Sequence, residues 1–450
     1  MRKIARIIAA ALGLGLALGL AGCGGGGGGS SSSSTANAPA NAPAVAPAAA
    51  SAPTGPGGTT SNPSTGDSSS NALAVDASAV PTPVGPGNTM SVTVSGTGIH
   101  NQPMVSVKLC APGSNASTSC TTIPNVIVDT ASFGLRLVRS AIPTSTFNAL
   151  TAETDQPSGL PLAECALFGS GYAWGSVRLA DIGLSSEVAA SVPIQVIGDS
   201  ALTIAAPSEC QVGRPLAAAS DLGANGILGI GVSPVDCGSQ CALTALSQFY
   251  YTNAGNAVSV PVSKQISNPV ARFAQDNNGV ILEMAQVSDS GSATAQGTLV
   301  FGIDTQANNV LNGTGAPILR TDLNGDFTSS YGGTTFTQTF FDSGSTVLFF
   351  PDTTIARDAS SGYYIPTATV GRTSTLAGTN PTSVSLGFNI ANAATLTSSG
   401  NNAFNNLGIY MTRQFDFGLP FFYGRHVYYG ISGRASAGGG TGPYVAYVSS

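Results

Sequence analysis

Charged residues and histidine are both scarce in this sequence of 450 residues. Only 8% of the residues are charged, and the two histidines are His100 and His426. Histidine-dependent catalysis and histidine-rich metal sites are therefore restricted from the start. The motifs Gly-x-Ser-x-Gly and His-Glu-x-x-His are also missing. A Ser-His-Asp hydrolase would have to use His426, in a strand-like run, or His100, and remains the weaker reading.

The chain has three lysines, no basic run and a net charge of −6. This balance argues against a nucleic-acid partner. Glycine, serine, threonine and asparagine are plentiful instead, and short apolar runs alternate with them. The composition is typical of an exported all-β protein with a hydroxyl-rich surface.

A secretory leader is expected at residues 1–23. Arg2, Lys3 and Arg6 precede an apolar run that ends in Leu-Ala-Gly-Cys, as in a bacterial lipobox. A transmembrane helix is the alternative, but the run is shorter than the ~20 apolar residues that a span needs. We expect Cys23 to be lipidated and to anchor the protein to the bacterial cell envelope. The small residues after Cys23 favour the outer membrane.

Residues 24–95 are expected to form a disordered tether. They are rich in glycine, serine, alanine and proline and have few large apolar residues, so they cannot bury enough surface to offset the entropy of ordering.

Six cysteines remain once Cys23 is assigned to lipid. An even number in an exported chain favours disulfides, and 15 connectivities are possible for six cysteines. Proximity in sequence suggests the pairs Cys110–Cys120, Cys165–Cys210 and Cys237–Cys241. A cysteine metal site is the alternative, but no Cys-x-x-Cys pair is present, and we expect no metal.

Short strands are predicted throughout the rest of the chain, with one helix over 242–251. In the segment 322–326, oxygen-bearing residues have the spacing of a calcium loop, but the glycine and glutamate of such a loop are missing. A hairpin turn at Asn324-Gly325 is favoured instead.

Two stretches, 125–135 and 338–348, share one pattern. Each has an apolar strand-like run, one aspartate (Asp129 or Asp342), a hydroxyl residue, a small residue and a second serine, followed by another apolar run. The pattern predicts a strand, a tight loop and a strand. Two such loops could place their carboxylates face to face, as shared-proton chemistry requires. Between them lie a glycine-rich aromatic hairpin at 168–175 and the apolar-apolar-Gly segment Ile227-Leu228-Gly229.

In these motifs the chain resembles the pepsin-like aspartic peptidases. The two aspartate loops resemble their Asp-Thr/Ser-Gly-Ser/Thr motifs, and Phe168 to Gly171 resembles their flap. The Cys-x-Leu-Phe and Trp-Gly-Ser-Val stretch and the ending Gly-Leu-Pro-Phe-Phe-Tyr-Gly-Arg more closely resemble an uncharacterised bacterial lipoprotein family (DUF3443-like) within that superfamily.

The resemblance implies an all-β, bilobal, pepsin-like fold of two related β-barrel lobes with a cleft between them. Lobe one would span 100–260 and lobe two 261–440. Asp129 and Asp342 would be the catalytic pair of an aspartic endopeptidase, and would need no cofactor. The implied supporting residues are Thr130, Ser132, Ser343 and Ser345, and the implied flap residues are Phe168, Gly169, Ser170 and Gly171.

Two positions depart from the family pattern. Ala131 stands where the family has glycine, so a methyl group could crowd the loop or exclude a positive φ. Phe168 replaces the flap tyrosine and removes a phenol hydroxyl. The alternative function is therefore a catalytically inactive pepsin-like surface binding module. In either case we expect a monomer whose partner is an extended polypeptide, as substrate or as ligand.

Overall fold

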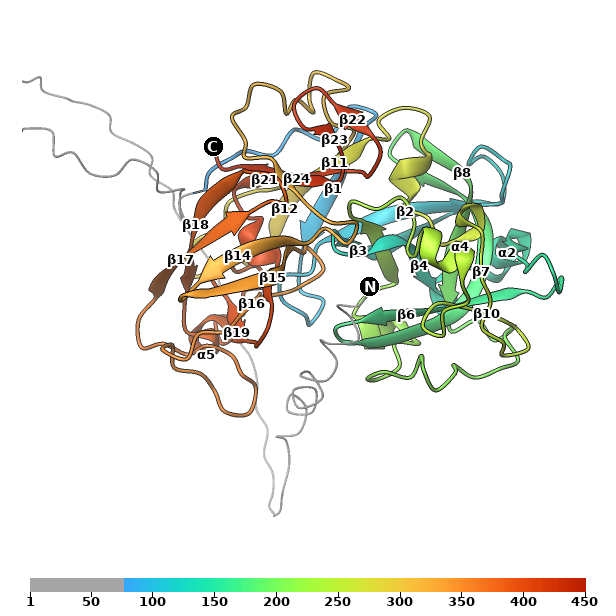
Figure 1. Cartoon of the computed structure of the whole chain (residues 1–450), viewed down its shortest axis with the longest axis horizontal. Coiled ribbons are helices and arrows are strands. Elements are labelled where there is room, and N and C mark those ends of the chain that lie inside the picture. Colours follow the sequence, from blue (N-terminus) through green and yellow to red (C-terminus); the bar gives the residue numbers. More distant parts are fainter. Residues whose placement is uncertain (1–76) are drawn as a thin grey trace, which may run out of the picture.

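The computed structural model describes residues 77–450, so the predicted leader, Cys23 and residues 24–76 of the expected tether lie outside the described part. Most of the described chain is β-strand with a few short helices, and it forms two lobes joined by a shared sheet (Figure 1). The prediction of a bilobal all-β fold is confirmed. Within residues 77–450 no helix is both long enough and apolar enough to cross a membrane.

The elements of the first half are β1 (Thr89–Val94), β2 (Met104–Cys110), β3 (Thr121–Asp129), β4 (Phe133–Val138), η2 (Arg139–Ala141), α2 (Thr144–Ala149), β5 (Thr151–Ala152), β6 (Leu162–Phe168), β7 (Gly171–Leu184), β8 (Glu187–Ile197), α3 (Ala219–Leu222), β9 (Gly226–Ile230), α4 (Ser239–Leu243), β10 (Tyr250–Thr252), η3 (Val262–Lys264) and η4 (Pro269–Arg272).

The elements of the second half are β11 (Gly279–Met284), β12 (Ala295–Phe301), β13 (Leu319–Arg320), β14 (Phe327–Tyr331), β15 (Thr334–Phe341), β16 (Leu348–Phe350), β17 (Val370–Ala377), β18 (Ser383–Ile390), α5 (Ala393–Thr397), β19 (Gly408–Tyr410), β20 (Phe415–Phe417), η5 (Leu419–Phe421), β21 (Arg425–Gly430), β22 (Ala435–Ser436), β23 (Gly440–Thr441) and β24 (Tyr444–Val448).

A 15-stranded sheet builds the first lobe and continues through β1 into β12, β11, β21, β24 and β13. The second lobe is completed by a seven-stranded sheet in the order β18-β17-β14-β15-β20-β16-β19. In Figure 1 the strands β4 to β10 gather on one side and β14 to β19 on the other, with β1, β11 and β12 between them.

The same interlocked arrangement of strands occurs in each lobe. In the first, β9 lies between β3 and β4, parallel to β3 and antiparallel to β4. In the second, β20 lies between β15 and β16, parallel to β15 and antiparallel to β16. Each aspartate loop is the short connection that leads from the first strand of such a trio to the last. The two lobes therefore place the two aspartates at equivalent points.

The folded part begins earlier than the sequence indicated. β1 lies inside the stretch assigned to the tether, yet it pairs with β12 along its whole length, from Thr89 opposite Val300 to Val94 opposite Ala295. Residues before β1 are also fixed, since Ser78 N donates to Ser449 O at 2.7 Å. The tether prediction is thus wrong for 77–95, because alternate buried valines and a sheet partner far along the chain offset the low-complexity composition. At the other end β24 extends the second lobe past residue 440.

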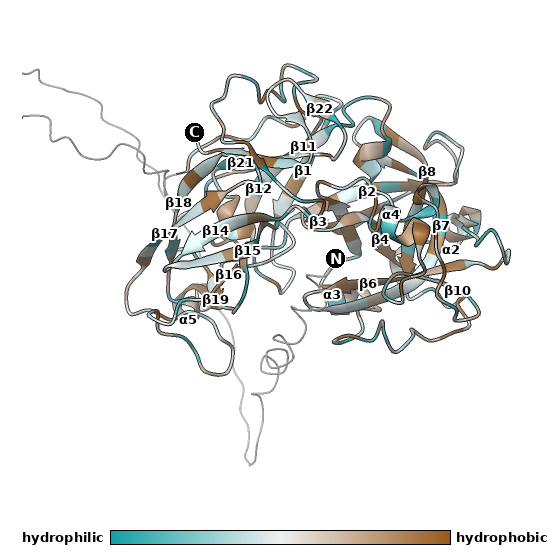
Figure 2. Cartoon of the chain, in the orientation of Figure 1, coloured by the Kyte–Doolittle hydropathy of each residue, from teal (hydrophilic) through white to brown (hydrophobic). Residues whose placement is uncertain are grey.

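Aromatic side chains fill the core of the second lobe. Phe341 stacks on Phe421 with ring centroids 4.1 Å apart, and Phe415 stacks on Phe417 at 4.5 Å. All four are buried. Figure 2 shows that the hydrophobic segments lie mainly on strands of both lobes, while outer loops are mostly neutral or hydrophilic.

The structure contains the three expected disulfides, Cys110–Cys120, Cys165–Cys210 and Cys237–Cys241. The helix predicted over 242–251 is wrong. A short helix, α4, ends at Leu243, and the chain then turns into β10, where Tyr250 pairs with Glu164 of β6. The buried hydroxyl of Tyr250 donates to Asp236 at 2.6 Å, so a tertiary contact overrides the local helical pattern.

Asn324 and Gly325 do form a turn, but not a hairpin between paired strands. Asp322 Oδ1 accepts hydrogen bonds from the backbone N–H groups of Asn324 and Asp326, each at 2.8 Å. The following strand, β14, pairs with β15 and β17. The turn is therefore closed by the Asp322 side chain rather than by strand pairing.

Val92 and Val84 test whether β1 belongs to the folded core. Val92 is fully buried, whereas 52% of Val84 is exposed. Val92→Ala should lower the free energy of unfolding by about 2 kcal/mol, because it removes buried methyl groups and leaves a cavity. Val84→Ala should change it by less than about 0.5 kcal/mol. Urea unfolding of the full chain measures both, and equal effects would contradict the placement of β1.

Candidate active site

The two predicted aspartates lie at the centre of the molecule, where the lobes meet. Asp129 is the last residue of β3 and is 8% exposed. Asp342 follows the last residue of β15 directly and is partly buried. Because β3 and β15 occupy equivalent places in the two lobes, each carboxyl enters the site from its own lobe in the same way.

Backbone and hydroxyl donors hold the Asp129 carboxylate. The backbone N–H groups of Ala131 and Ser132 donate to Oδ1 at 2.9 and 3.0 Å, and Ser132 Oγ donates to Oδ2 at 2.7 Å. Three donors on one carboxyl fix its orientation.

Asp342 has matching contacts. The backbone N–H of Gly344 donates to its Oδ1 at 2.8 Å, and Ser345 Oγ lies 2.9 Å from its Oδ2. Ser132 and Ser345, implied as supporting residues by the resemblance, each contact the Oδ2 atom of the aspartate in their own loop. Both carboxyls thus have a backbone donor and a serine hydroxyl from their own loops, and Asp129 has a further backbone donor in the Ser132 N–H.

Thr130 and Ser343 join the two loops across the interface of the lobes. Ser343 Oγ donates to Val128 O at 2.7 Å, and the Ser343 N–H donates to Thr130 Oγ1 at 2.9 Å. Thr130 Oγ1 in turn lies 3.4 Å from Phe341 O. All of these groups are buried, so the bonds are shielded from water and fix the separation of the two carboxyls.

Gly344 is in contact with both carboxyls. A Cβ atom built at this position would lie 2.9 Å from Cγ of Asp129 and 3.1 Å from Oδ1 of Asp342. The Asp129 carboxyl therefore approaches the Asp342 loop as closely as a glycine permits. Ala131, the counterpart in the other loop, has no positive φ, so its methyl group does not strain the backbone there.

Burial and the neighbouring charge of Asp129 raise the pKa of Asp342 to about 7, aided by a hydrogen bond between the two carboxyls. The donors from Ser345 and Gly344 act in the opposite direction and are outweighed. Two adjacent carboxyls that cannot both ionise cheaply share a proton over a range of pH.

The predicted flap forms the tip of the β6–β7 hairpin. Phe168 and Gly171 are paired across the two-residue turn Gly169-Ser170. Phe168 lines a pocket with Ala131 and Ser132 of the first aspartate loop, and Asn324 of the second lobe also contributes to this pocket. Its empty volume is about 620 Å³, part of it open to solvent. The structure thus brings the flap, the first aspartate loop and the second lobe around one cavity.

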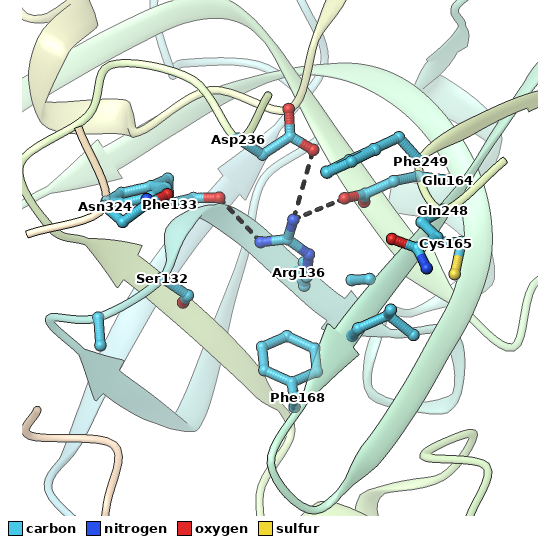
Figure 3. Close-up of a pocket in the computed structure, with 13 residues that line it drawn as sticks. Ser132, Phe133, Arg136, Glu164, Cys165, Phe168, Asp236, Gln248, Phe249 and Asn324 are labelled. Atoms are coloured by element: carbon cyan, nitrogen blue, oxygen red, sulfur yellow. Dashed lines mark hydrogen bonds and ion pairs between the residues drawn. The ribbon is translucent and has the colours of Figure 1, made fainter. Parts of the chain in front are cut away.

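A buried ionic cluster forms part of the wall of this pocket, with Arg136 at its centre (Figure 3). Arg136 Nη2 lies 2.6 Å from Glu164 Oε1 and 3.6 Å from Asp236 Oδ2, and its guanidinium carbon is 5.8 Å from the centre of the Phe168 ring. Burial and the nearby Glu164 raise the pKa of Asp236 well above its ordinary value. Glu164 and Asp236 are far from Arg136 in the chain, so local sequence patterns carry no signal for this cluster.

Asp416 on β20 is a further carboxyl at the site that sequence reasoning missed. It is 3% exposed, and its Oδ2 lies 2.6 Å from Ser345 Oγ. It lies between Phe415 and Phe417, which are both buried, in a strand of the second lobe. An aspartate at an inward position of such a strand is the signal that could have found it.

Comparison with known proteins places this site within a family. A model of the family described as "Protein of unknown function (DUF3443)" matches residues 85–447, which include both lobes and both aspartate loops. No curated protein matches the chain. Among solved structures, the aspartic proteinase from Irpex lacteus is similar over 80% of this chain and 97% of that chain, with a TM-score of 0.47 and 13% identity.

Gly344→Ala should destabilise the protein by about 1–3 kcal/mol, because the added methyl group overlaps the Asp129 carboxyl. Ala131→Gly is the matched control, and it should cost no more than about 1 kcal/mol, the entropy of a freer backbone. Urea unfolding at one pH compares the two variants. If Gly344→Ala were as stable as wild type, the carboxyls would not be packed as closely as the structure has them.

The raised pKa of Asp342 predicts a pH-dependent loss of stability. A carboxyl with a raised pKa favours folding below its ordinary pKa of 3.8, and this contribution is lost as the pH rises towards 7. Asp342→Asn should therefore become more stable than wild type over this range, by on the order of 2–4 kcal/mol at the upper end.

Asp352 provides a control of opposite sign for this prediction. Although burial opposes it, hydrogen bonds from Arg372 and Thr354 lower the pKa of Asp352 to about 2. Asp352→Asn should therefore be less stable than wild type at neutral pH, and the difference should shrink as the pH falls towards 2. Urea unfolding at a series of pH values distinguishes the two cases. A pH-independent difference for Asp342→Asn would contradict the coupled pair.

Proposed function

The chain belongs to the DUF3443 family, and from the geometry of its two aspartates we propose that it is an aspartic endopeptidase. The observation that carries the proposal is the pair itself. Asp129 and Asp342 come from equivalent points of two lobes, are held by equivalent donors, and lie beside a pocket under a flap. The raised pKa of Asp342 supports unequal ionisation of the two carboxyls. A general acid must be protonated while a general base is ionised, so unequal ionisation suits these two roles.

In the proposed reaction, a water molecule attacks the carbon of a peptide carbonyl. The ionised carboxyl accepts a proton from the water as the new C–O bond forms, and the protonated carboxyl donates its proton to the carbonyl oxygen. Collapse of the tetrahedral intermediate then breaks the C–N bond. The carboxyl that took the water proton gives it to the leaving nitrogen, and a hydroxyl of the intermediate returns a proton to the other carboxyl, which restores the pair. Thr130 and Ser343 keep the two carboxyls at a fixed separation throughout.

The proposed substrate is an extended polypeptide segment that lies between the aspartates and the flap, where main-chain hydrogen bonds supply affinity. Phe168 has no hydroxyl to donate, so the flap would act through its backbone and its ring. Phe133, Phe168 and Phe249 line the pocket beside the first aspartate loop, which favours an apolar side chain of the substrate there.

The proposal includes a place of action. The lipobox-like ending at Cys23 supports lipid anchoring to the cell envelope, with residues 24–76 between the anchor and the first described residue. A monomer is the proposed state. The second candidate function, an inactive polypeptide-binding module, is favoured by one observation, the replacement of the flap phenol by Phe168.

Hydrolysis of a peptide library by the full chain from pH 3 to 7 tests the proposal. Asp129→Asn and Asp342→Asn should each lower kcat by at least about 10³-fold, because neither carboxyl can replace the other in proton transfer. Asp289→Asn, which changes an exposed carboxyl in the loop between β11 and β12, is the control and should leave kcat unchanged. A statine-type inhibitor should block the wild type.

Two results would contradict the proposal. Cleavage that persists in both aspartate variants would assign hydrolysis to another site or to a contaminant. Binding of extended peptides without cleavage by the wild type, unaffected by either substitution, would favour the binding module.

A further inference from the structure

The connection from β1 to β2 is in contact with both aspartate loops. Its Pro103 O accepts a hydrogen bond at 2.9 Å from the N–H of Val128, the residue before the first aspartate. Two residues earlier in the same connection, Asn101 Nδ2 donates at 2.9 Å to the carbonyl of Thr346, four residues after the second aspartate. A piece of chain three residues long therefore contacts the strand that ends at one aspartate and the loop that follows the other.

Asn101 uses its whole side-chain amide in these contacts. Besides Thr346 O, its Nδ2 donates to Phe404 O at 3.0 Å. Its Oδ1 accepts from the Phe404 N–H at 2.7 Å and from the Tyr423 hydroxyl at 2.9 Å. An asparagine amide has two N–H donors and two acceptor sites, so all four are occupied. The residue is fully buried and has a φ of 51°, which asparagine tolerates better than most residues.

The contacts of Asn101 and Ser343 fix the second aspartate loop at both ends. Ser343 Oγ donates to Val128 O at one end, and Asn101 donates to Thr346 O at the other. The N–H of the same Val128 is held by Pro103 O. The loop is thus tied to one residue of β3 twice, directly at its start and through the β1–β2 connection at its end.

The first lobe holds the equivalent carbonyl by a different donor. Phe133 stands four residues after the first aspartate, as Thr346 stands four residues after the second. Arg136 Nη1 donates to Phe133 O at 2.8 Å, and Arg136 is buried. In both lobes a buried side-chain N–H group therefore holds the carbonyl at the same place after the aspartate. The recurrence of this contact with different residue types supports a role in the site.

We propose that Asn101 is a positioning residue of the site, which holds Thr346 O so that the two donors of the second loop stay aligned with Asp342. Those donors are the Gly344 N–H, 2.8 Å from Oδ1, and Ser345 Oγ, 2.9 Å from Oδ2. Both lie between the two fixed ends of the loop, so release of Thr346 weakens their contacts. The catalytic meaning of this inference rests on the proposed function, but the positioning itself does not.

The direction in which these donors act gives the expected effect on Asp342. They lower its pKa, while burial and the charge of Asp129 raise it and prevail. Weaker donors therefore leave the pKa of Asp342 higher still. Asp416 and Tyr429 also face this part of the site, and His100 precedes the positioning residue in the chain. A neutral substitution at position 101 leaves all of these titratable groups in place.

An NMR titration of the full chain, labelled with ¹³C at aspartate carboxyl carbons, tests the inference without any activity. Asn101→Gly removes the four contacts of the amide, and glycine adopts a positive φ without strain. The upper step in the titration of the Asp129 and Asp342 pair should move up by about 0.5 pH unit or more. An unchanged titration in folded Asn101→Gly would overturn the proposal.

Asn309→Gly is the matched control. Asn309 is 1% exposed, and its amide also makes four hydrogen bonds, to Phe301 O, to Thr305 Oγ1 and to the N–H groups of Thr305 and Gln306. None of these partners lies in an aspartate loop, so this variant should lose stability without a shift in the titration. Equal shifts in the two variants would indicate a general loosening of the second lobe and would overturn the role of Asn101.

Asn101→Ser decides the question if Asn101→Gly does not fold. A serine hydroxyl has a single hydrogen, so it can replace at most one of the two donations that Nδ2 makes. The titration should shift in the same direction as expected for the glycine variant. A folded Asn101→Ser with the titration of the wild type would count against the proposal in the same way.

Peptide hydrolysis separates this inference from the proposed function. Asn101 lies outside the residues that line the pocket under the flap, so Asn101→Gly should lower kcat by about tenfold or more and change KM by less than about threefold. If no peptide is cleaved but the titration shifts as expected, the endopeptidase proposal fails and the positioning role stands. If peptides are cleaved and neither kcat nor the titration changes, hydrolysis stands and the role of Asn101 fails.

Discussion

The site depends on the hydrogen bonds that tie the two aspartate loops together. Ser343 contacts the first lobe at Val128 O and at Thr130 Oγ1, and both contacts are buried. These bonds connect the ends of β3 and β15, which belong to two different β-sheets. Without these bonds, the two carboxyls would lose the contacts between the loops that hold them together against their mutual repulsion.

Holding the two carboxyls together makes it less favourable to ionise both of them. Burial and the charge of Asp129 raise the pKa of Asp342, which means that folding places it where its charged form is disfavoured. Each carboxyl receives a backbone donor and a serine donor from its own loop, and these hydrogen bonds offset part of the cost of burying it. Gly344 permits the close approach, while the equivalent Ala131 is accommodated without positive φ.

The strands and both aspartate loops could be predicted from the sequence, because each depends on residues close together in the chain. The three disulfides join cysteines that are neighbours in sequence order, although Cys165 and Cys210 are 45 residues apart. Apolar runs with period two define strands, and short separations favour disulfide pairs. The prediction of secondary structure failed where contacts between residues far apart in the chain determine the structure. β1 is a strand because it pairs with β12. The segment before Tyr250 is not a long helix, because Tyr250 pairs with β6 and its hydroxyl donates to Asp236.

Within the site, the sequence identified the groups of the two loops but not those that reach them from elsewhere. Glu164, Asp236 and Asp416 are isolated acids in their local sequence, and only the fold brings them beside Arg136 or Ser345. Both departures from the expected pattern, Ala131 and Phe168, have definite places in the structure, one in the loop and one over the Arg136 guanidinium.

The most direct measurement of the central claim is an NMR titration of the Asp129 and Asp342 carboxyl carbons in the full chain, assigned with the two single Asp→Asn variants. The account predicts that the pair takes up its two protons in two separate steps, and that replacing either residue changes the titration of the other. Two independent titrations in the ordinary aspartate range, each unaffected by replacement of the other residue, would contradict it.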